Sequence, residues 1–149
     1  MQNPSAPERL RVAGLRVTKP RVAVLEVLDS AHAEHRHLTA ATIADRVRPQ
    51  LGTVSVQAVY DCLAALTRVG LLRTIEPAGH PVRYETSVGD EHHHLVCRTC
   101  GHIADVGALA PDACLRVPTD PEFRVETTEV TFWGLCPSCA ARTPELDRH

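Results

Sequence analysis

The side chains with the clearest chemistry are four of the six cysteines, which form two Cys-x-x-Cys pairs separated by residues 101–135: Cys97 with Cys100, and Cys136 with Cys139. Each pair can place two thiolates on one ion, and two pairs complete the tetrahedron that Zn²⁺ prefers, with no open position. The spacing therefore predicts a structural zinc site. The alternative is a dithiol redox pair, but such a pair does not need a second Cys-x-x-Cys.

A second group of ligand-type side chains directly precedes the first pair of cysteines, in the segment DEHHHLVC. Side chains alternate along an extended chain, so His92 and His94 are expected on the same side, with His93 facing away. Glu85 and Asp105 bracket them in the sequence. Imidazoles mixed with carboxylates favour a harder and more exchangeable ion than thiolates do. The pattern indicates a second metal site, the alternative being a solvated polar loop.

The two remaining cysteines carry no comparable signal. Cys62 falls on the apolar stripe of a predicted helix and is expected to be a small buried side chain. Nothing near Cys114 indicates a nucleophile. The sequence contains no Ser-His-Asp pattern, no glycine-rich phosphate loop and no His-Glu-x-x-His helix. We therefore do not expect an enzyme.

Composition limits the architecture that positions these groups. The 149 residues suffice for one ordinary domain or two small ones, and 44% hydrophobic against 3% aromatic residues predicts cores of Val, Leu, Ala and Ile. No apolar run approaches 18 residues and the N-terminus lacks an apolar signal core, so a cytoplasmic protein is expected. Residues 1–89 hold 11 Lys/Arg against 8 Asp/Glu, whereas residues 90–149 hold 5 against 10. The basic first half gives modest support for a polyanionic partner.

The first half predicts three main helices followed by a β-hairpin. A disordered start is expected to stop at Pro7 and to be followed by a short helix over 8–14. Three longer helices are then expected after the N-caps Thr18, Thr39 and Ser55. The helix after Thr39 is closed by Pro49 and Gly52, and the helix after Ser55 ends at Gly70. Strands over 71–77 and 80–86 flank a turn at Ala78-Gly79.

This order is typical of a winged helix-turn-helix, whose third helix reads DNA. That helix is expected to bury Val59, Cys62, Leu63, Leu66 and Val69 and to expose Gln57, Tyr60, Asp61 and Arg68. The alternative is that any three-helix domain has such a polar face.

The second half predicts a small α/β unit. Strands are expected over 95–100 and 102–106, joined at Gly101, with a small helix over 107–117, a long alternating strand over 123–136 and a closing turn with a polar tail. The fold class is therefore α+β, with one domain over residues 1–86 and another over residues 87–149.

Several motifs in combination resemble the ferric uptake regulator (Fur) family over nearly the whole chain: LRVTKPRVAVLEVL, HLTAATIAD, SVQAVYDCLAALTRVGLL, RYE, DEHHHLVCRTCG and WGLCPSC. Within that family the chain is most similar to the branch that controls catalase-peroxidase genes in response to peroxide. The resemblance implies a metal-dependent, homodimeric repressor of an operator in double-stranded DNA, with an N-terminal winged helix and a C-terminal dimerisation domain.

The resemblance also implies roles for particular residues. The family's regulatory site, suited to Fe(II) and also to Mn(II) or Zn(II), falls on His37, Glu85, His92, His94 and Asp105. The four-thiolate zinc site falls on the cysteines of the two pairs. The implied DNA contacts are Tyr60, with Ser55 and Gln57 on the same helix, and phosphate contacts from Arg16 and Lys19.

The chain departs from the family at two places. Thr128 stands where a further metal site has a histidine, so a complete third site is not expected. Ala58 and Asp61 replace the Thr and Arg that usually flank Val-Tyr in the family's recognition helix. This departure predicts an operator sequence that differs from the iron-uptake box of the family.

The expected function is a repressor that senses peroxide through Fe(II). Within the same class, the alternative is a sensor of iron or zinc sufficiency that regulates metal uptake. From another class, the alternative is a metal-storage protein or a redox enzyme in which the histidine and carboxylate site is catalytic.

Overall fold

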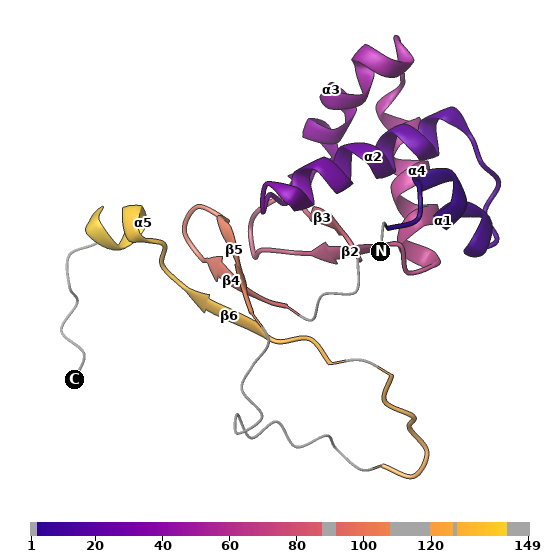
Figure 1. The fold of residues 1–149 in the computed structure, drawn as a ribbon. Coiled ribbons are helices and arrows are strands. Elements are labelled where there is room, and N and C mark those ends of the chain that lie inside the picture. The colour runs from indigo at the N-terminus through magenta and orange to yellow at the C-terminus, as the bar shows by residue number, and fades with distance from the viewer. Residues whose placement is uncertain (1–2, 88–91, 108–119, 127, 143–149) are drawn as a thin grey trace, which may run out of the picture. The chain divides into compact units, whose positions relative to one another are not determined.

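The computed structural model describes residues 3–87, 92–107, 120–126 and 128–142 (Figure 1). The chain divides into two compact units, Met1–Gly89 and Asp90–His149. Each contains helix and sheet, which confirms the predicted α+β class. No helix in the described parts of the chain is both long enough and apolar enough to cross a membrane.

The N-terminal unit combines four helices with a small antiparallel sheet, drawn from indigo to magenta in Figure 1. Its strands lie in the order β1-β3-β2. The predicted helices and hairpin are confirmed, and the two-residue strand β1, which no pattern predicted, adds a third strand beside β3. The elements in chain order are α1 (Ala6–Val12), α2 (Lys19–Ala33), β1 (Leu38–Thr39), α3 (Ala40–Leu51), α4 (Val56–Arg68), β2 (Leu72–Ile75) and β3 (Arg83–Thr86).

All three predicted N-caps are present. The side chains of Thr18, Thr39 and Ser55 each accept a hydrogen bond from the backbone N–H three residues later, at 3.3, 3.3 and 3.1 Å. Such bonds satisfy a donor that the first helical turn leaves unpaired. The caps therefore determine where α2, α3 and α4 begin.

One predicted helix start and one predicted helix stop are wrong, and both errors concern proline, whereas the predicted end at Gly52 is confirmed. The helix predicted over 8–14 begins at Ala6, because Ser5 and Glu8 form a capping box and Pro7 fits the first turn, where its missing N–H costs nothing. Pro49 does not close α3 but lies inside its last turn, and the helix continues to Leu51. It ends at Gly52, whose φ of 69° is unfavourable for other residues.

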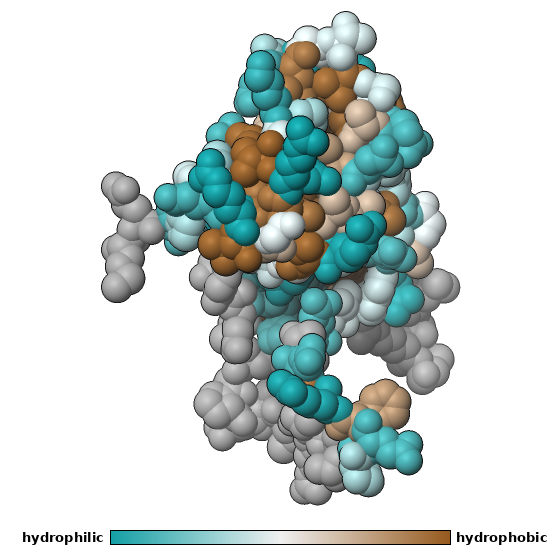
Figure 2. Space-filling view, turned by 90° about the vertical axis from the view of Figure 1, so that its right-hand side faces the viewer, coloured by the Kyte–Doolittle hydropathy of each residue, from teal (hydrophilic) through white to brown (hydrophobic). Residues whose placement is uncertain are grey.

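The core of this unit is formed by the facing sides of the helices, with Leu25, Leu28, Ile43 and Leu66 each 0% exposed. The predicted stripe of α4 is buried from Val59 to Leu66 and only partly buried at Val69. Its opposite side is exposed, as expected. On one face of the molecule, hydrophobic residues also reach the surface between hydrophilic ones (Figure 2).

The described residues of the C-terminal unit form a three-stranded sheet in the order β5-β4-β6 and one short helix, drawn from salmon to yellow in Figure 1. Strand β4 is antiparallel to β5 across a turn that contains Gly101, and it is parallel to β6. A strand is present on either side of Gly101 as predicted, but residues 98–100 of the first predicted strand lie in the turn. The elements are β4 (His93–Cys97), β5 (Ile103–Val106), β6 (Thr131–Gly134) and α5 (Pro137–Arg142).

Two further expectations for this unit are wrong, and others concern residues outside the described part of the chain. The long strand predicted over 123–136 is wrong, since among the described residues of that range only Thr131–Gly134 is a strand, and Phe123 and Val125 are 76% and 48% exposed. The closing turn is instead helix α5, with Pro137 at its first position. Residues 108–117 of the predicted small helix, Cys114 and the polar tail from residue 143 lie outside the described residues.

Candidate metal centres and nucleic-acid interface

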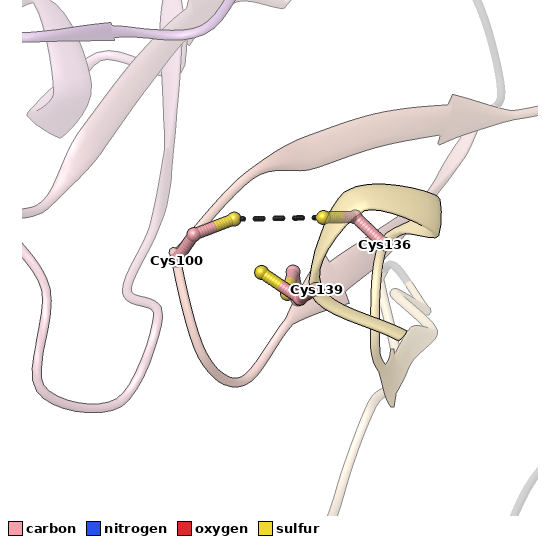
Figure 3. Close-up of side chains that lie close together, drawn as sticks. Cys100, Cys136 and Cys139 are labelled. Atoms are coloured by element: carbon pink, nitrogen blue, oxygen red, sulfur yellow. Dashed lines mark hydrogen bonds between the residues drawn. The ribbon is translucent and has the colours of Figure 1, made fainter. Parts of the chain in front are cut away.

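The four cysteines of the two pairs converge in the C-terminal unit. Cys97 ends β4, Cys100 lies in the turn before β5, Cys136 directly precedes α5 and Cys139 lies within that helix. Their sulfur atoms all lie within 4.8 Å of one another, and the Sγ atoms of Cys100 and Cys136 are 3.7 Å apart (Figure 3). Zinc–sulfur bonds of about 2.3 Å in a tetrahedron place sulfurs about 3.8 Å apart. The cluster therefore fits one Zn²⁺.

The thiols of this cluster differ in acidity. Backbone hydrogen bonds from Cys100 and Cys136 lower the pKa of Cys97 to about 6, because they stabilise its thiolate. The side-chain hydrogen bond with Cys136, followed by burial, raises the pKa of Cys139 to about 12. By themselves the four sulfurs thus carry only part of their possible negative charge. A divalent cation removes the mutual repulsion and favours the ionised form of all four.

Two arginines lie beside the cysteine cluster. The Nη2 atom of Arg142 donates to the Sγ atom of Cys139 at 3.7 Å. The guanidinium carbon of Arg98 lies 5.6 Å from the centre of the Trp133 ring, a cation–π distance. Four thiolates with one Zn²⁺ carry a net charge of −2, so a positive partner stabilises the occupied site.

A buried polar pair lies in the N-terminal unit. His37, directly before β1, places Nε2 3.0 Å from Oε2 of Glu85 on β3, and their side chains are only 3% and 2% exposed. The short strand β1 makes this possible, because it pairs with β3 from the residue after His37 onward. Buried ionisable groups require such partners. One imidazole and one carboxylate, both ligand types found in metal sites, thus lie together in this unit.

Two arginines hold this pair, and no sequence pattern identified either of them. Arg83 donates from Nη1 to the backbone oxygen of His37 at 3.2 Å, and Nη2 of Arg73 lies 3.4 Å from Oε1 of Glu85. The predicted two-residue turn at Ala78-Gly79 would pair residue 77 with residue 80 and place residue 73 opposite residue 84. The structure instead pairs Arg73 with Glu85, so the predicted register did not reveal this contact.

A second group of potential ligands lies in the C-terminal unit. His94 on β4 pairs with Asp105 on β5, and the Nε2 atoms of His92 and His94 each lie 3.7 Å from Oδ1 of Asp105. The rings of the two histidines meet edge to face, with centroids 4.9 Å apart. His93 makes a different contact, since its Nδ1 accepts the backbone N–H of Val130 at 3.2 Å. Two imidazoles and one carboxylate thus converge.

The exposed side of α4 carries the predicted DNA-contacting residues. Tyr60 is 48% exposed, and Gln57 donates from Nε2 to Oδ1 of Asp61 at 2.9 Å. The Ser55 hydroxyl already accepts the capping bond from Ala58. Of the two predicted phosphate contacts, Lys19 is the first residue of α2, and Arg16 lies exposed in the segment before it. The charge and exposure of these residues suit a duplex.

Comparison with known proteins identifies relatives of this chain. The sequence profile of the Ferric uptake regulator family matches residues 12–131. The chain is 51% identical over 138 residues to "Transcriptional regulator FurA" of Mycobacterium tuberculosis (strain ATCC 25618 / H37Rv), covering 92% of this chain and 91% of that protein. It is 28% identical over 131 residues to "Peroxide-responsive repressor PerR" of Staphylococcus aureus, covering 87% and 86%.

Solved structures share the fold. The ferric uptake regulator Fur of Helicobacter pylori has a TM-score of 0.69 at 24% identity, covering 91% of this chain and 92% of that one. The regulator of Pseudomonas aeruginosa, solved with manganese, has a TM-score of 0.68 at 24% identity, covering 89% and 98%. The chain belongs to the ferric uptake regulator family and is therefore a metal-dependent transcriptional regulator, not an enzyme.

Proposed function

We propose that this chain is a homodimeric repressor that acts in the cytoplasm. Its DNA binding depends on Fe(II) at a regulatory metal site and ends when peroxide reacts at that site. The observation that supports the proposal is that each unit brings histidine and carboxylate side chains together. The N-terminal unit contributes His37 and Glu85, and the C-terminal unit contributes His92, His94 and Asp105. This donor set suits Fe(II), Mn(II) or Zn(II) with room for a water molecule.

Ligands on both units supply a mechanism for control. His37 is joined through β1 to Thr39, the N-cap of α3, and α3 precedes the proposed recognition helix α4. When His37 and Glu85 share an ion with the other three ligands, the units are held at one angle. In a dimer that angle sets the separation of two recognition helices, which must match successive major grooves. The four-cysteine site is proposed to hold Zn²⁺ permanently.

The DNA contacts divide into positioning and reading residues. Lys19→Ala should weaken binding to every duplex and reduce the slope of log affinity against log salt by about one, because one phosphate contact is lost. Tyr60→Phe should instead change the preference among sequences, since it removes a hydroxyl from the exposed side of α4. Salt-dependent binding to selected and random duplexes tests both. Identical behaviour of the two variants contradicts the division.

Peroxide is preferred over metal sufficiency as the signal because the sequence motifs resemble the peroxide-responsive branch of the family, and because one relative, 28% identical, is named "Peroxide-responsive repressor PerR". The family name itself supports the alternative, a sensor of iron or zinc. The deciding experiment measures binding to a duplex selected from a random library. The metal-free, Mn(II) and Fe(II) forms are compared, and the two metal-bound forms are measured again after peroxide treatment. Peroxide should release the Fe(II) form, but not the Mn(II) form, from the duplex. If metal removal releases the protein and peroxide does not, the sensor of metal sufficiency is favoured.

The site of oxidation gives an independent test. With Fe(II) held by His37, Glu85, His92, His94 and Asp105, the iron would promote cleavage of the O–O bond of peroxide. Overall, one oxygen of H2O2 would be added to a liganding imidazole, which is oxidised by two electrons, and the other oxygen would leave as water. Mass spectrometry of the treated Fe(II) protein should therefore find added oxygen on a peptide with His37, His92 or His94, and the Mn(II) protein should show none. Oxidation confined to Cys62, Cys114 or the zinc thiolates moves the sensor to sulfur.

A further inference from the structure

The carboxylate of Glu85 is held from two sides within the N-terminal unit. Oε2 faces Nε2 of His37 at 3.0 Å, and Oε1 faces Nη2 of Arg73 at 3.4 Å. The side chain of Glu85 is 2% exposed and that of Arg73 is 23% exposed. Arg73 and Glu85 are also direct partners across β2 and β3, so the backbone register fixes this contact. The guanidinium is thus a built-in cation on a carboxylate that lies among the proposed metal ligands.

We propose that Arg73 sets the affinity of the regulatory metal site. Its guanidinium holds Glu85 in place before a cation binds, and it weakens the binding of that cation by sharing the carboxylate. The inference rests on the proposed function, because Glu85 matters here only as one of the proposed ligands.

The direction of the effect follows from charge. The usual hydrogen-bond partners of a metal ligand are carboxylates and carbonyls, which make the ligand a stronger donor. A guanidinium does the opposite, because it withdraws charge from the carboxylate and cannot lose its proton. With both side chains mostly shielded from water, solvent screens little of the repulsion between the guanidinium and a divalent cation on the same carboxylate. Arg73 therefore weakens binding of the cation while it keeps the carboxylate of Glu85 in position.

Arg83 does not share this role, although it lies in the same sheet. Its Nη1 donates to the backbone carbonyl of His37, at 3.2 Å, and so restrains the chain rather than a proposed ligand atom. A regulatory site must be able to release its ion when DNA binding ends. A cation held permanently beside one ligand weakens metal binding enough for release without the loss of that ligand.

The test is a Mn(II) titration of the zinc-loaded, full-length chain. Arg73→Gln keeps a hydrogen-bond donor but removes the charge, and it should bind Mn(II) about tenfold more tightly, a difference of about 1.4 kcal/mol. Arg73→Lys keeps the charge and should stay within about twofold of the parent protein. The matched control is Arg36→Gln, which removes one positive charge from a side chain that is 61% exposed. It should leave the affinity unchanged.

Thermal unfolding gives a second readout that does not depend on DNA binding. Arg73→Gln should lower the unfolding temperature of the Mn(II)-free protein, because the buried carboxylate loses its balancing charge. It should also increase the rise in temperature that saturating Mn(II) produces. Equal or weaker Mn(II) affinity in Arg73→Gln overturns the inference, since a merely structural role predicts that result.

Glu85→Ala separates this inference from the proposed function. If Glu85 is a ligand, Glu85→Ala weakens Mn(II) binding and a further Arg73→Gln substitution then has no effect on it. Weakened binding in Glu85→Ala together with unchanged binding in Arg73→Gln overturns the inference alone. Unchanged binding in Glu85→Ala overturns the proposed ligand set, and the inference falls with it.

Discussion

Cys100→Ser should lose one zinc ion per chain and leave the C-terminal unit unfolded. Among the described residues of that unit, Val96 and Ile103 are the only buried aliphatic side chains, so its core is small. Structural zinc contributes about 10–16 kcal/mol of folding free energy in small domains, which equals or exceeds the whole stability of a typical domain. The contact that closes the cluster, 3.7 Å between the sulfurs of Cys100 and Cys136, is lost in this variant.

Metal analysis and circular dichroism measure the two parts of this expectation. The control is Cys62→Ser, the same change at a buried cysteine of α4, where burial raises the pKa of the thiol and disfavours a reactive thiolate. This control should keep its zinc and lose only about 1–3 kcal/mol of stability, the cost of burying an unpaired hydroxyl. A folded, zinc-free dimer of Cys100→Ser contradicts the structural assignment.

The N-terminal unit was readily predicted because its signals are local. Each cap hydroxyl bonds a backbone N–H three residues away, and the stripe of α4 repeats with the period of the helix itself. The prediction failed where a partner distant in sequence decides the structure. Strand β1 has only two residues, and it is a strand only because β3 lies beside it. No periodicity can be detected in two residues.

The alternation over 123–136 misled for a related reason. Alternating apolar residues favour a strand when one face is buried, yet Phe123 and Val125 are exposed in this chain. Only the part that pairs with β4, from Thr131 to Gly134, is a strand. The pattern describes what a segment can form, whereas the neighbouring strand determines where it forms.

The candidate metal sites were predictable from residue type and spacing, but their surroundings were not. Two Cys-x-x-Cys pairs identify a cluster without knowledge of the fold, and alternation along β4 anticipates that His92 and His94 approach the same carboxylate oxygen. The contact between Arg73 and Glu85 depends on the hairpin register, and that between Arg83 and His37 depends on β1. Charges beside the ligands therefore had to come from the structure.

His37→Ala should uncouple metal binding from DNA binding. His37 and Glu85 are the only proposed ligands in the N-terminal unit, and His37 leads directly into β1 and α3. Without this imidazole, two histidines and two carboxylates remain, enough for weakened Mn(II) binding. The restraint on the N-terminal unit is lost, so most of the metal-induced gain in operator affinity should disappear. Coupling free energies of this kind are about 1–3 kcal/mol, or roughly 5- to 150-fold in affinity.

The measurement compares operator affinity with and without saturating Mn(II), so that weaker metal binding does not by itself lower the response. His32→Ala provides the matched control, because it removes a histidine of α2 that is outside the proposed ligand set. It should keep the full response to Mn(II). Circular dichroism should show both variants folded, since alanine favours helix at position 32 and the zinc site is intact in each. A His37→Ala protein that still gains the full operator affinity at saturating Mn(II) would show that the ion does not act through this residue. Control of DNA binding would then have to come from the C-terminal ligands alone.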